Sequence, residues 1–332
     1  MPCCWVSIDE FGRAKEAWFR QFLELPNGIP SHDTFNRVFT RLSPQGFQRC
    51  FTSWVRSLSG AYAGLIALDG KRLRRSHDRA ADKSAIHRVS AWAVETALVL
   101  GQVKTDEKSN EITAIPQLLE LLALEGCLVT LDAMGCQKPI AQKSIDQGGD
   151  YVLALKGNQS GLRDRVLTAF ETAEEAAFKG YTVDTLETKD IGHGRMEIRR
   201  YCVLGTQGVL EAPGWAGLQM IGVVEAERTD NGKTSLEMRY YMGSIPPQAA
   251  RFAKAVRGHW GIENSLQWVL DVAFREDDCR VRKGYGAENL AVLRHIALNA
   301  VKQEKTAKIG VKNKRLRAGW DEPYLAKILA GI

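Results

Sequence analysis

LIALDGK (65–71) is the stretch that decides the fold, because an apolar β-type run ends there in an acidic residue, Asp69. CLVTLDAM (127–134) repeats the arrangement with Asp132. These runs predict buried strands, and a carboxylate that ends such a strand is costly to desolvate without a partner. Either aspartate alone could simply open a turn. Two at the ends of neighbouring strands favour a functional site, because sites in layered α/β folds lie at strand ends.

The chain around these runs alternates between β-type and helical segments. RVSAWAVETALVLGQVKT (88–105) follows the first run closely, and YVLALK (151–156) follows the second. Two helical segments, ITAIPQLLELLA (112–123) and QKPIAQKSIDQG (137–148), separate the later strands. This order predicts an α/β fold with a mixed sheet, in which an antiparallel meander precedes β-α-β crossovers packed with helices.

The remaining segments indicate further divisions of the chain. Residues 1–60 carry apolar side chains at helical spacing, whereas 179–245 contain four β-type runs separated by turn sequences. We expect a core over 61–178 that resumes at 246–300 with its last helices. The β-rich block is then an insertion in this core, and 301–332 form a basic tail.

Composition and charge are those of an ordinary globular protein. The 332 residues are 45% hydrophobic and 25% charged, and the net charge of +6 favours a polyanionic partner without proving one. No apolar run could span a bilayer and no signal-peptide pattern is present, which predicts a cytoplasmic protein. The seven cysteines lack the spacing of a zinc site, so free thiols are expected.

A metal-dependent site at the two strand ends would need a further acid. Hard divalent cations prefer several carboxylate oxygens, and two such ions about 4 Å apart can promote displacement at phosphorus. FAKAVRGHWGIENSLQWVLDVAF (252–274) carries an apolar stripe with Glu263 at its margin. A glutamate at such a margin is usually only its solvated border. The pattern leaves Asp271 and the run Glu276-Asp277-Asp278 as alternatives.

Four motifs, IALDGK, LDAMGCQ, YVLALKGNQ and HWGIEN, resemble in this order the DDE transposases of bacterial insertion sequences, in particular the H-repeat-associated group linked to Rhs elements. NGIPSHDTFNRVF resembles the N-terminal associated domain of that group, so the likeness covers nearly the whole chain. It implies an RNase H-like mixed sheet flanked by helices, with a β-rich insertion before the last catalytic helix. It also places the catalytic, metal-binding triad at Asp69, Asp132 and Glu263.

The activity that this resemblance implies is metal-dependent cleavage and strand transfer at the ends of an insertion element. The three acids would hold two Mg²⁺ ions, for which Mn²⁺ could substitute, and no covalent enzyme–DNA intermediate would form. DNA is the implied partner, bound by a homodimer in the synaptic complex. Two other hypotheses stay open: a Mg²⁺-dependent nuclease without strand transfer, and an inactive DNA-binding remnant.

Two features depart from the family pattern. A broader set of relatives carries Tyr-x2-Arg-x3-Glu-x6-Lys around the glutamate, whereas here His259 and Leu270 occupy the Arg and Lys positions. Family members also usually carry an additional helical segment before the part that resembles IDEFGRAKEAWF (8–19). We therefore expect a shortened N-terminal region, which leaves the activity of this copy open.

Basic residues are predicted to contact the DNA backbone, because cations that neutralise phosphates give salt-dependent affinity with little sequence preference. A merely solvated cationic surface would show the same pattern. Lys71 is expected to face the same phosphates as Asp69, and His259 or Arg257 could take the role of the missing arginine. The full predicted set is Lys71, Arg72, Arg74, Arg75, Lys156, His193, Arg195, Arg257, His259, Lys312, Lys314 and Arg315.

Overall fold

A computed structural model describes residues 5–59, 62–77, 84–105, 111–192 and 194–331. The strands are β1 (Leu65–Arg72), β2 (His87–Ala93), β3 (Leu98–Lys104), β4 (Leu128–Leu131), β5 (Asp150–Leu155), β6 (Val183–Gly192), β7 (Arg195–Gly205), β8 (Met220–Asp230) and β9 (Lys233–Gly243). The α-helices are α1 (Trp5–Ala14), α2 (Glu16–Phe19), α3 (His32–Arg41), α4 (Pro44–Ser59), α5 (Glu111–Glu120), α6 (Lys138–Asp146), α7 (Ser160–Glu175), α8 (Ala249–Ile262), α9 (Trp268–Phe274), α10 (Gly286–Gln303), α11 (Val311–Trp320) and α12 (Glu322–Leu329). Short 3-10 helices cover Gly157–Gln159 and Glu276–Asp278, and a π-helical segment, Glu263–Gln267, joins α8 to α9.

The first five strands form the predicted mixed sheet. β1 to β3 are an antiparallel meander, whereas β4 lies parallel to β1 and β5 lies parallel to β4. Parallel neighbours need a crossover connection, and α5 and α6 precede β4 and β5 as these crossovers. This arrangement confirms the RNase H-like fold class.

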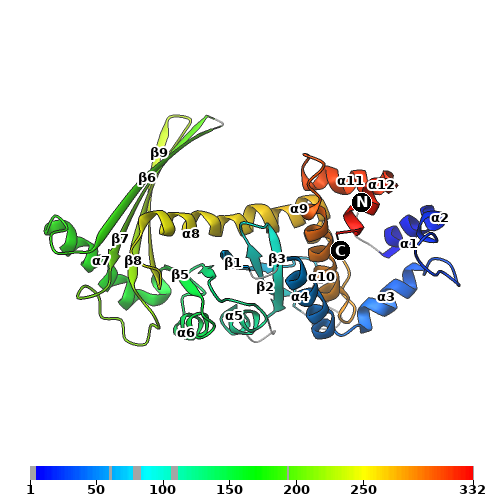
Figure 1. Cartoon of the computed structure of the whole chain (residues 1–332), viewed down its shortest axis with the longest axis horizontal. Helices are drawn as coiled ribbons and strands as arrows, with labels where there is room; N and C mark the ends of the chain where they lie inside the picture. The colour runs from blue at the N-terminus through cyan, green and yellow to red at the C-terminus, as the bar shows by residue number, and fades with distance from the viewer. Residues whose placement is uncertain (1–4, 60–61, 78–83, 106–110, 193, 332) are drawn as a thin grey trace.

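The predicted β-rich insertion continues the same sheet. The nine strands lie in the order β3-β2-β1-β4-β5-β9-β8-β7-β6, and β9 joins the core by antiparallel pairing with β5, Val152 opposite Gly243. The distal parts of these long strands project from the body (Figure 1). Asn231 and Gly232 join β8 to β9 with φ of 50° and 77°, as the two-residue turn of a hairpin requires.

Helices cover both faces of the core sheet. α8 packs on β1 on one side, and α5 packs on β2 and β3 on the other (Figure 1). The main core includes the fully buried side chains of Ile66, Trp92 and Leu118. At the β3 edge, Asn299 of α10 bonds both backbone groups of Val99: the Val99 amide donates to Oδ1 at 2.8 Å, and Nδ2 donates to the carbonyl at 2.9 Å. A covered edge strand cannot pair with another chain.

The C-terminal segment, expected as a basic tail, folds into α11 and α12. Ala318 of α11 and Tyr324 and Ile328 of α12 pack with Ala300 and Val301 of α10, so the segment is a packed unit. None of the described helices is long and apolar enough to cross a membrane. Cys50, Cys127, Cys136 and Cys202 are free thiols, as expected.

Candidate functional site

A cavity of about 440 Å³ lies where the core sheet, α8 and the insertion meet. Asp69, Asp132 and Glu263 line one part of it. The strand register explains the position of the aspartates, because Ala67 of β1 pairs with Thr130 of β4 and each aspartate lies two residues further along its strand. Asp69 therefore lies within β1, which continues to Arg72, beside Asp132, which directly follows the carboxyl end of the adjacent parallel strand β4.

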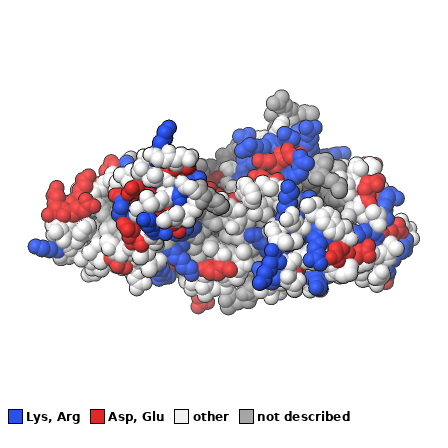
Figure 2. Space-filling model, turned by 90° about the horizontal axis from the view of Figure 1, so that it is seen from above, with Lys and Arg blue, Asp and Glu red and all other residues white. Residues whose placement is uncertain are grey.

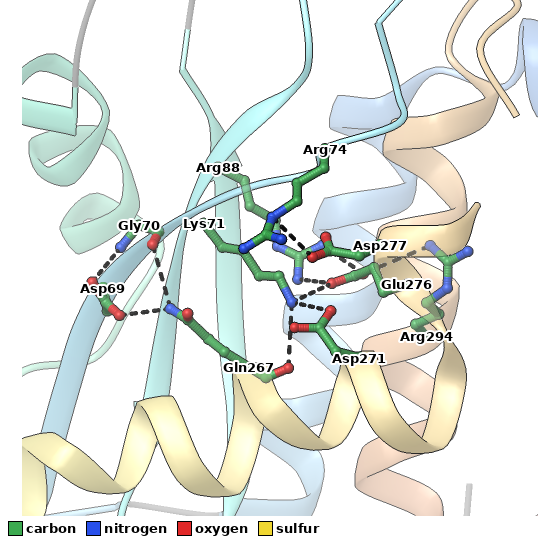
Figure 3. Close-up of polar contacts among 10 residues, drawn as sticks. All are labelled: Asp69, Gly70, Lys71, Arg74, Arg88, Gln267, Asp271, Glu276, Asp277 and Arg294. Atoms are coloured by element: carbon green, nitrogen blue, oxygen red, sulfur yellow. Dashed lines mark hydrogen bonds and ion pairs between the residues drawn. The ribbon is translucent and has the colours of Figure 1, made fainter. Parts of the chain in front are cut away.

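Backbone amides bond to both aspartates. The Gly70 amide donates to Asp69 Oδ1 at 2.8 Å, and the Met134 amide donates to Asp132 Oδ1 at 3.0 Å. The turn interpretation holds for Asp132 and is wrong for Asp69, because β1 continues past Asp69 to Arg72 and pairs there with β2. Gln267 adds a side-chain bond, since its Nε2 donates to Asp69 Oδ2 at 2.6 Å (Figure 3).

Glu263 begins the π-helical segment. Single π-helical turns are frequent at functional sites, because they change the direction in which the following side chains point. Here the segment carries Glu263, which is exposed at the cavity, and ends with Gln267, which contacts Asp69. His259, one turn earlier, is half-buried, with Nδ1 3.1 Å from Thr130 Oγ1. Burial lowers the pKa of His259, which keeps the ring neutral near pH 7.

Two of the alternative acids, Asp271 and Glu276, belong to a separate ion-pair network (Figure 3). Arg88 holds Glu276 through two bonds of 2.8 and 2.7 Å, and Arg294 lies 3.6 Å from the same carboxylate. Lys71 donates to Asp271 and is 3.6 Å from Glu276. This network ties β1 and β2 to the end of α9 and lies outside the cavity.

The site carries excess negative charge. Burial, together with the charges of Glu111, Asp132 and Glu263, raises the pKa of Asp69 to about 7. Glu111 was missed by the sequence analysis. It begins α5, and its Oε1 lies 2.8 Å from His87 Nε2. An acid in the first turn of a helix is common, so no local pattern distinguishes this one.

The chemistry of the donor set fits a hard divalent cation, because several carboxylates converge without an equal number of cations. Within the ranges that the structure describes, no three acidic, histidine or cysteine side chains are placed to hold one metal ion. Joint ligation would therefore require the side chains to draw together. Asp132 and Glu263 are both exposed, which leaves room for such movement.

Two residues predicted to contact DNA, Lys156 and His259, line the cavity. Lys156 is exposed there, and Arg163 and Arg239 add two cations that were not predicted. The guanidinium of Arg239 lies 4.7 Å from the centre of the Trp260 ring. His259 differs from the arginine of the family pattern, because its lowered pKa leaves the ring without a positive charge near pH 7.

The structure contradicts the predicted DNA contacts of Lys71 and Lys314, because both side chains are buried. Lys71 is only 8% exposed and its ammonium is bound to Asp271, so it does not face the cavity beside Asp69. Lys314 is also 8% exposed, and its ammonium lies 3.5 Å from Glu304 Oε2. Both lysines are committed to intramolecular ion pairs whose partners would be left buried and charged if they moved.

The remaining predicted contacts lie at the surface, and His193 falls outside the described residues. Surface ion pairs are weak, so these cations stay available to a polyanion. Figure 2 shows Lys and Arg side chains gathered right of the centre of one face, with a smaller acidic group among them. Four of these residues form ion pairs with aspartates: Arg74 with Asp277, Arg75 with Asp278, Arg195 with Asp230 and Arg257 with Asp190. Arg315 lies over the Phe274 ring, and Arg72 and Lys312 are exposed.

Comparisons with known proteins match nearly the whole chain. Residues 62–300 match the family described as "Transposase DDE domain", and residues 3–55 match the one described as "DDE_Tnp_1-associated". The protein YbfL and the "H repeat-associated putative transposase YhhI", both of Escherichia coli (strain K12), are each 41% identical over 98% of this chain and 88% of their own length. A solved piggyBac transposase synaptic complex with hairpin DNA aligns at 11% identity over 98% of this chain and 71% of that chain, with a TM-score of 0.45.

Proposed function

Because the chain belongs to the Transposase DDE domain family, as its four motifs predicted, we propose that it cleaves and joins DNA at the ends of an insertion element in a metal-dependent reaction. The observation that carries this proposal is the cavity that gathers Asp69, Asp132 and Glu263 from two adjacent strands and one helix. These acids, distant in sequence, line the same cavity as the exposed Lys156, and phosphoryl transfer on a polyanion uses both kinds of group.

The three acids have unequal parts in the proposed site. The pairing of β1 with β4 puts the backbones of Asp69 and Asp132 in neighbouring positions, so their side chains would define the position of one ion between them. Glu263 is exposed on the π-helical segment and would complete the position of a second ion. Two bound Mg²⁺ or Mn²⁺ ions would supply an activated water or 3′-hydroxyl and charge stabilisation for the leaving oxygen.

The other part of the cavity is suited to a DNA backbone. Lys156, Arg163 and Arg239 supply positive charge, and Trp260 presents a ring that is 41% exposed. Cations at this place would orient a phosphate towards the carboxylates, and they would do so with little sequence preference. A homodimer holding two DNA ends belongs to the same proposal and rests on family membership alone.

The test is a joining assay with the full chain. Duplexes with exposed 3′-hydroxyl ends, carrying the DNA that flanks the coding sequence, are incubated with a supercoiled plasmid and Mg²⁺ or Mn²⁺. Joined products are expected from the wild type, and none from Asp132→Asn. Asp146→Asn is the matched control, because Asp146 is exposed on α6 and does not line the cavity.

Each competing hypothesis predicts a different result. A nuclease without strand transfer gives nicked plasmid and no joined product. A DNA-binding remnant gives neither product with any divalent ion while still shifting DNA in a gel. Joining that survives Asp132→Asn would contradict the catalytic assignment itself.

A further inference from the structure

Gln267, the last residue of the π-helical segment, is bonded to β1 by its side chain and by its backbone (Figure 3). Its Nε2 donates to Asp69 Oδ2 at 2.6 Å and to the Gly70 carbonyl at 3.4 Å. Its own carbonyl accepts from the Lys71 ammonium at 3.3 Å. Three consecutive residues of the strand that carries Asp69 therefore hold one residue of the segment that carries Glu263.

The side-chain bonds fix the orientation of two groups. The Gly70 carbonyl can only accept, so the nitrogen side of the Gln267 amide must face β1, and its two hydrogens serve both acceptors. The Asp69 carboxylate is held in turn, because Oδ1 accepts from the Gly70 amide and Oδ2 accepts from Gln267. Each carboxylate oxygen can take a second bond, so both oxygens remain able to bind a group in the cavity that Asp69 lines.

The backbone bond of Gln267 is held by a buried ion pair. Lys71 is only 8% exposed, and its ammonium also donates to Asp271 and lies 3.6 Å from Glu276. Arg88 binds the same Glu276 carboxylate through two bonds. Moving Lys71 would leave Glu276 buried with less compensating charge, which is costly. Lys71 therefore fixes the Gln267 end of the π-helical segment to the sheet.

One π-helical turn connects Gln267 to Glu263. The Trp268 amide donates to the Glu263 carbonyl, five residues earlier, and this bond closes the turn. The Glu263 side chain is exposed at the cavity, whereas Gln267 is half-buried and does not line it. The bonds that set the position of Glu263 against β1 therefore lie at the other end of the turn, at Gln267.

Resting on the proposed function, we propose that Gln267 is a positioning residue, which orients the Asp69 carboxylate and fixes the place of Glu263 relative to it. Asp69 and Glu263 come from a strand and a helix, and the bond from Gln267 to Asp69 links these two elements directly. Removing the hydrogen-bond partner of a metal-ligating group typically lowers metal affinity or activity by about 10- to 100-fold.

The test compares Gln267→Met with the wild type, both as full chains, because methionine has the length of glutamine and no N–H donor. Mn²⁺ binding, measured by electron paramagnetic resonance of the free ion, should weaken about 10- to 100-fold. In EDTA, the backbone amides of residues 263–268 should exchange with solvent up to about 10-fold faster, since opening the segment no longer breaks the bond to Asp69. DNA binding in EDTA, measured by fluorescence anisotropy, should be unchanged, whereas a general loss of structure would weaken it.

Gln142→Met is the matched control. Gln142 Nε2 donates to Asp146 Oδ1 at 2.7 Å on the exposed surface of α6, so this variant removes the same kind of bond away from the cavity. Its Mn²⁺ affinity and the exchange of residues 263–268 should match those of the wild type.

The outcomes separate this inference from the proposed function. If Asp132→Asn loses Mn²⁺ while Gln267→Met binds it with wild-type affinity, Gln267 has no positioning role and the proposed function stands. Unchanged amide exchange in Gln267→Met, or a loss of DNA binding in EDTA, would also overturn the inference alone. If the wild type binds no Mn²⁺, both fail together. Should Gln267→Met not fold, Gln267→Asn carries the test: its amide is one methylene short of Asp69, and wild-type Mn²⁺ affinity in that variant overturns the inference.

Discussion

Asp69→Asn should change how the stability of the metal-free protein depends on pH. Burial and the neighbouring acids raise the pKa of Asp69 from an ordinary 3.8 to about 7. A carboxyl group whose pKa is raised in the folded state contributes stability that is complete below its unfolded pKa and is lost as the pH rises towards the folded pKa. The loss therefore falls between about pH 4 and pH 7 and levels off above.

The magnitude follows from the size of the shift. About 3 pKa units correspond to about 4 kcal/mol in total, and about 3 kcal/mol of this falls between pH 5 and pH 8. Asparagine cannot ionise, so Asp69→Asn removes the loss of stability that ionisation of Asp69 causes in the wild type. We expect the free energy of unfolding of the wild type, relative to that of the variant, to fall by about 3 kcal/mol over this range.

The assay is urea unfolding of both proteins in EDTA at pH 5, 6, 7 and 8. Asp146→Asn is the control, because Asp146 is exposed on α6. The difference in free energy of unfolding between this variant and the wild type should not vary with pH. Adding Mg²⁺ should flatten the pH dependence of the wild type, because a cation stabilises the ionised carboxylate. If the difference in free energy of unfolding between the wild type and Asp69→Asn stays constant from pH 5 to pH 8, the raised pKa of Asp69 is refuted.

Three further predictions concern the ion-pair network, the sheet edge and the cavity. Glu276→Gln should lower the free energy of unfolding by about 3–5 kcal/mol, because it leaves Arg88 buried without its counterion; a loss below about 1 kcal/mol in urea unfolding would contradict the network. Asn299→Leu should cost about 2–3 kcal/mol, since it leaves both backbone groups of Val99 unpaired at the β3 edge; wild-type protection of the Val99 amide in hydrogen exchange would argue against this. Lys156→Ala should weaken binding equally for unrelated DNA sequences and reduce the slope of log affinity against log salt by about 1, measured by fluorescence anisotropy; an unchanged slope would remove Lys156 from the interface.

Most helices and strands could be predicted from the sequence, because periodicity and turn residues are local. The four strands of the insertion and the Asn231-Gly232 turn are examples. The joining of the insertion to the core sheet could not be predicted, because the pairing of Val152 with Gly243 unites segments 91 residues apart and has no local signal. The two C-terminal helices were missed because basic residues outnumber the few apolar ones that pack.

The site divides in the same way. Asp69 and Asp132 could be predicted because each directly follows an apolar run, and the pairing of the two adjacent parallel strands then brings them together. Lys71 was misjudged, because a lysine two residues from an aspartate gives no hint of Asp271, its partner 200 residues away. Glu111 is the converse case, since only the folded arrangement brings it to Gly70.

The central claim is that Asp69, Asp132 and Glu263 together hold the catalytic metal. Anomalous diffraction at the manganese edge, from crystals of the full chain soaked in Mn²⁺, tests it most directly. The predicted result is a peak about 2 Å from carboxylate oxygens of Asp69 and Asp132, with Glu263 ligating this ion or a second one beside it. No peak in the cavity, or Mn²⁺ bound only elsewhere on the protein, would contradict the claim.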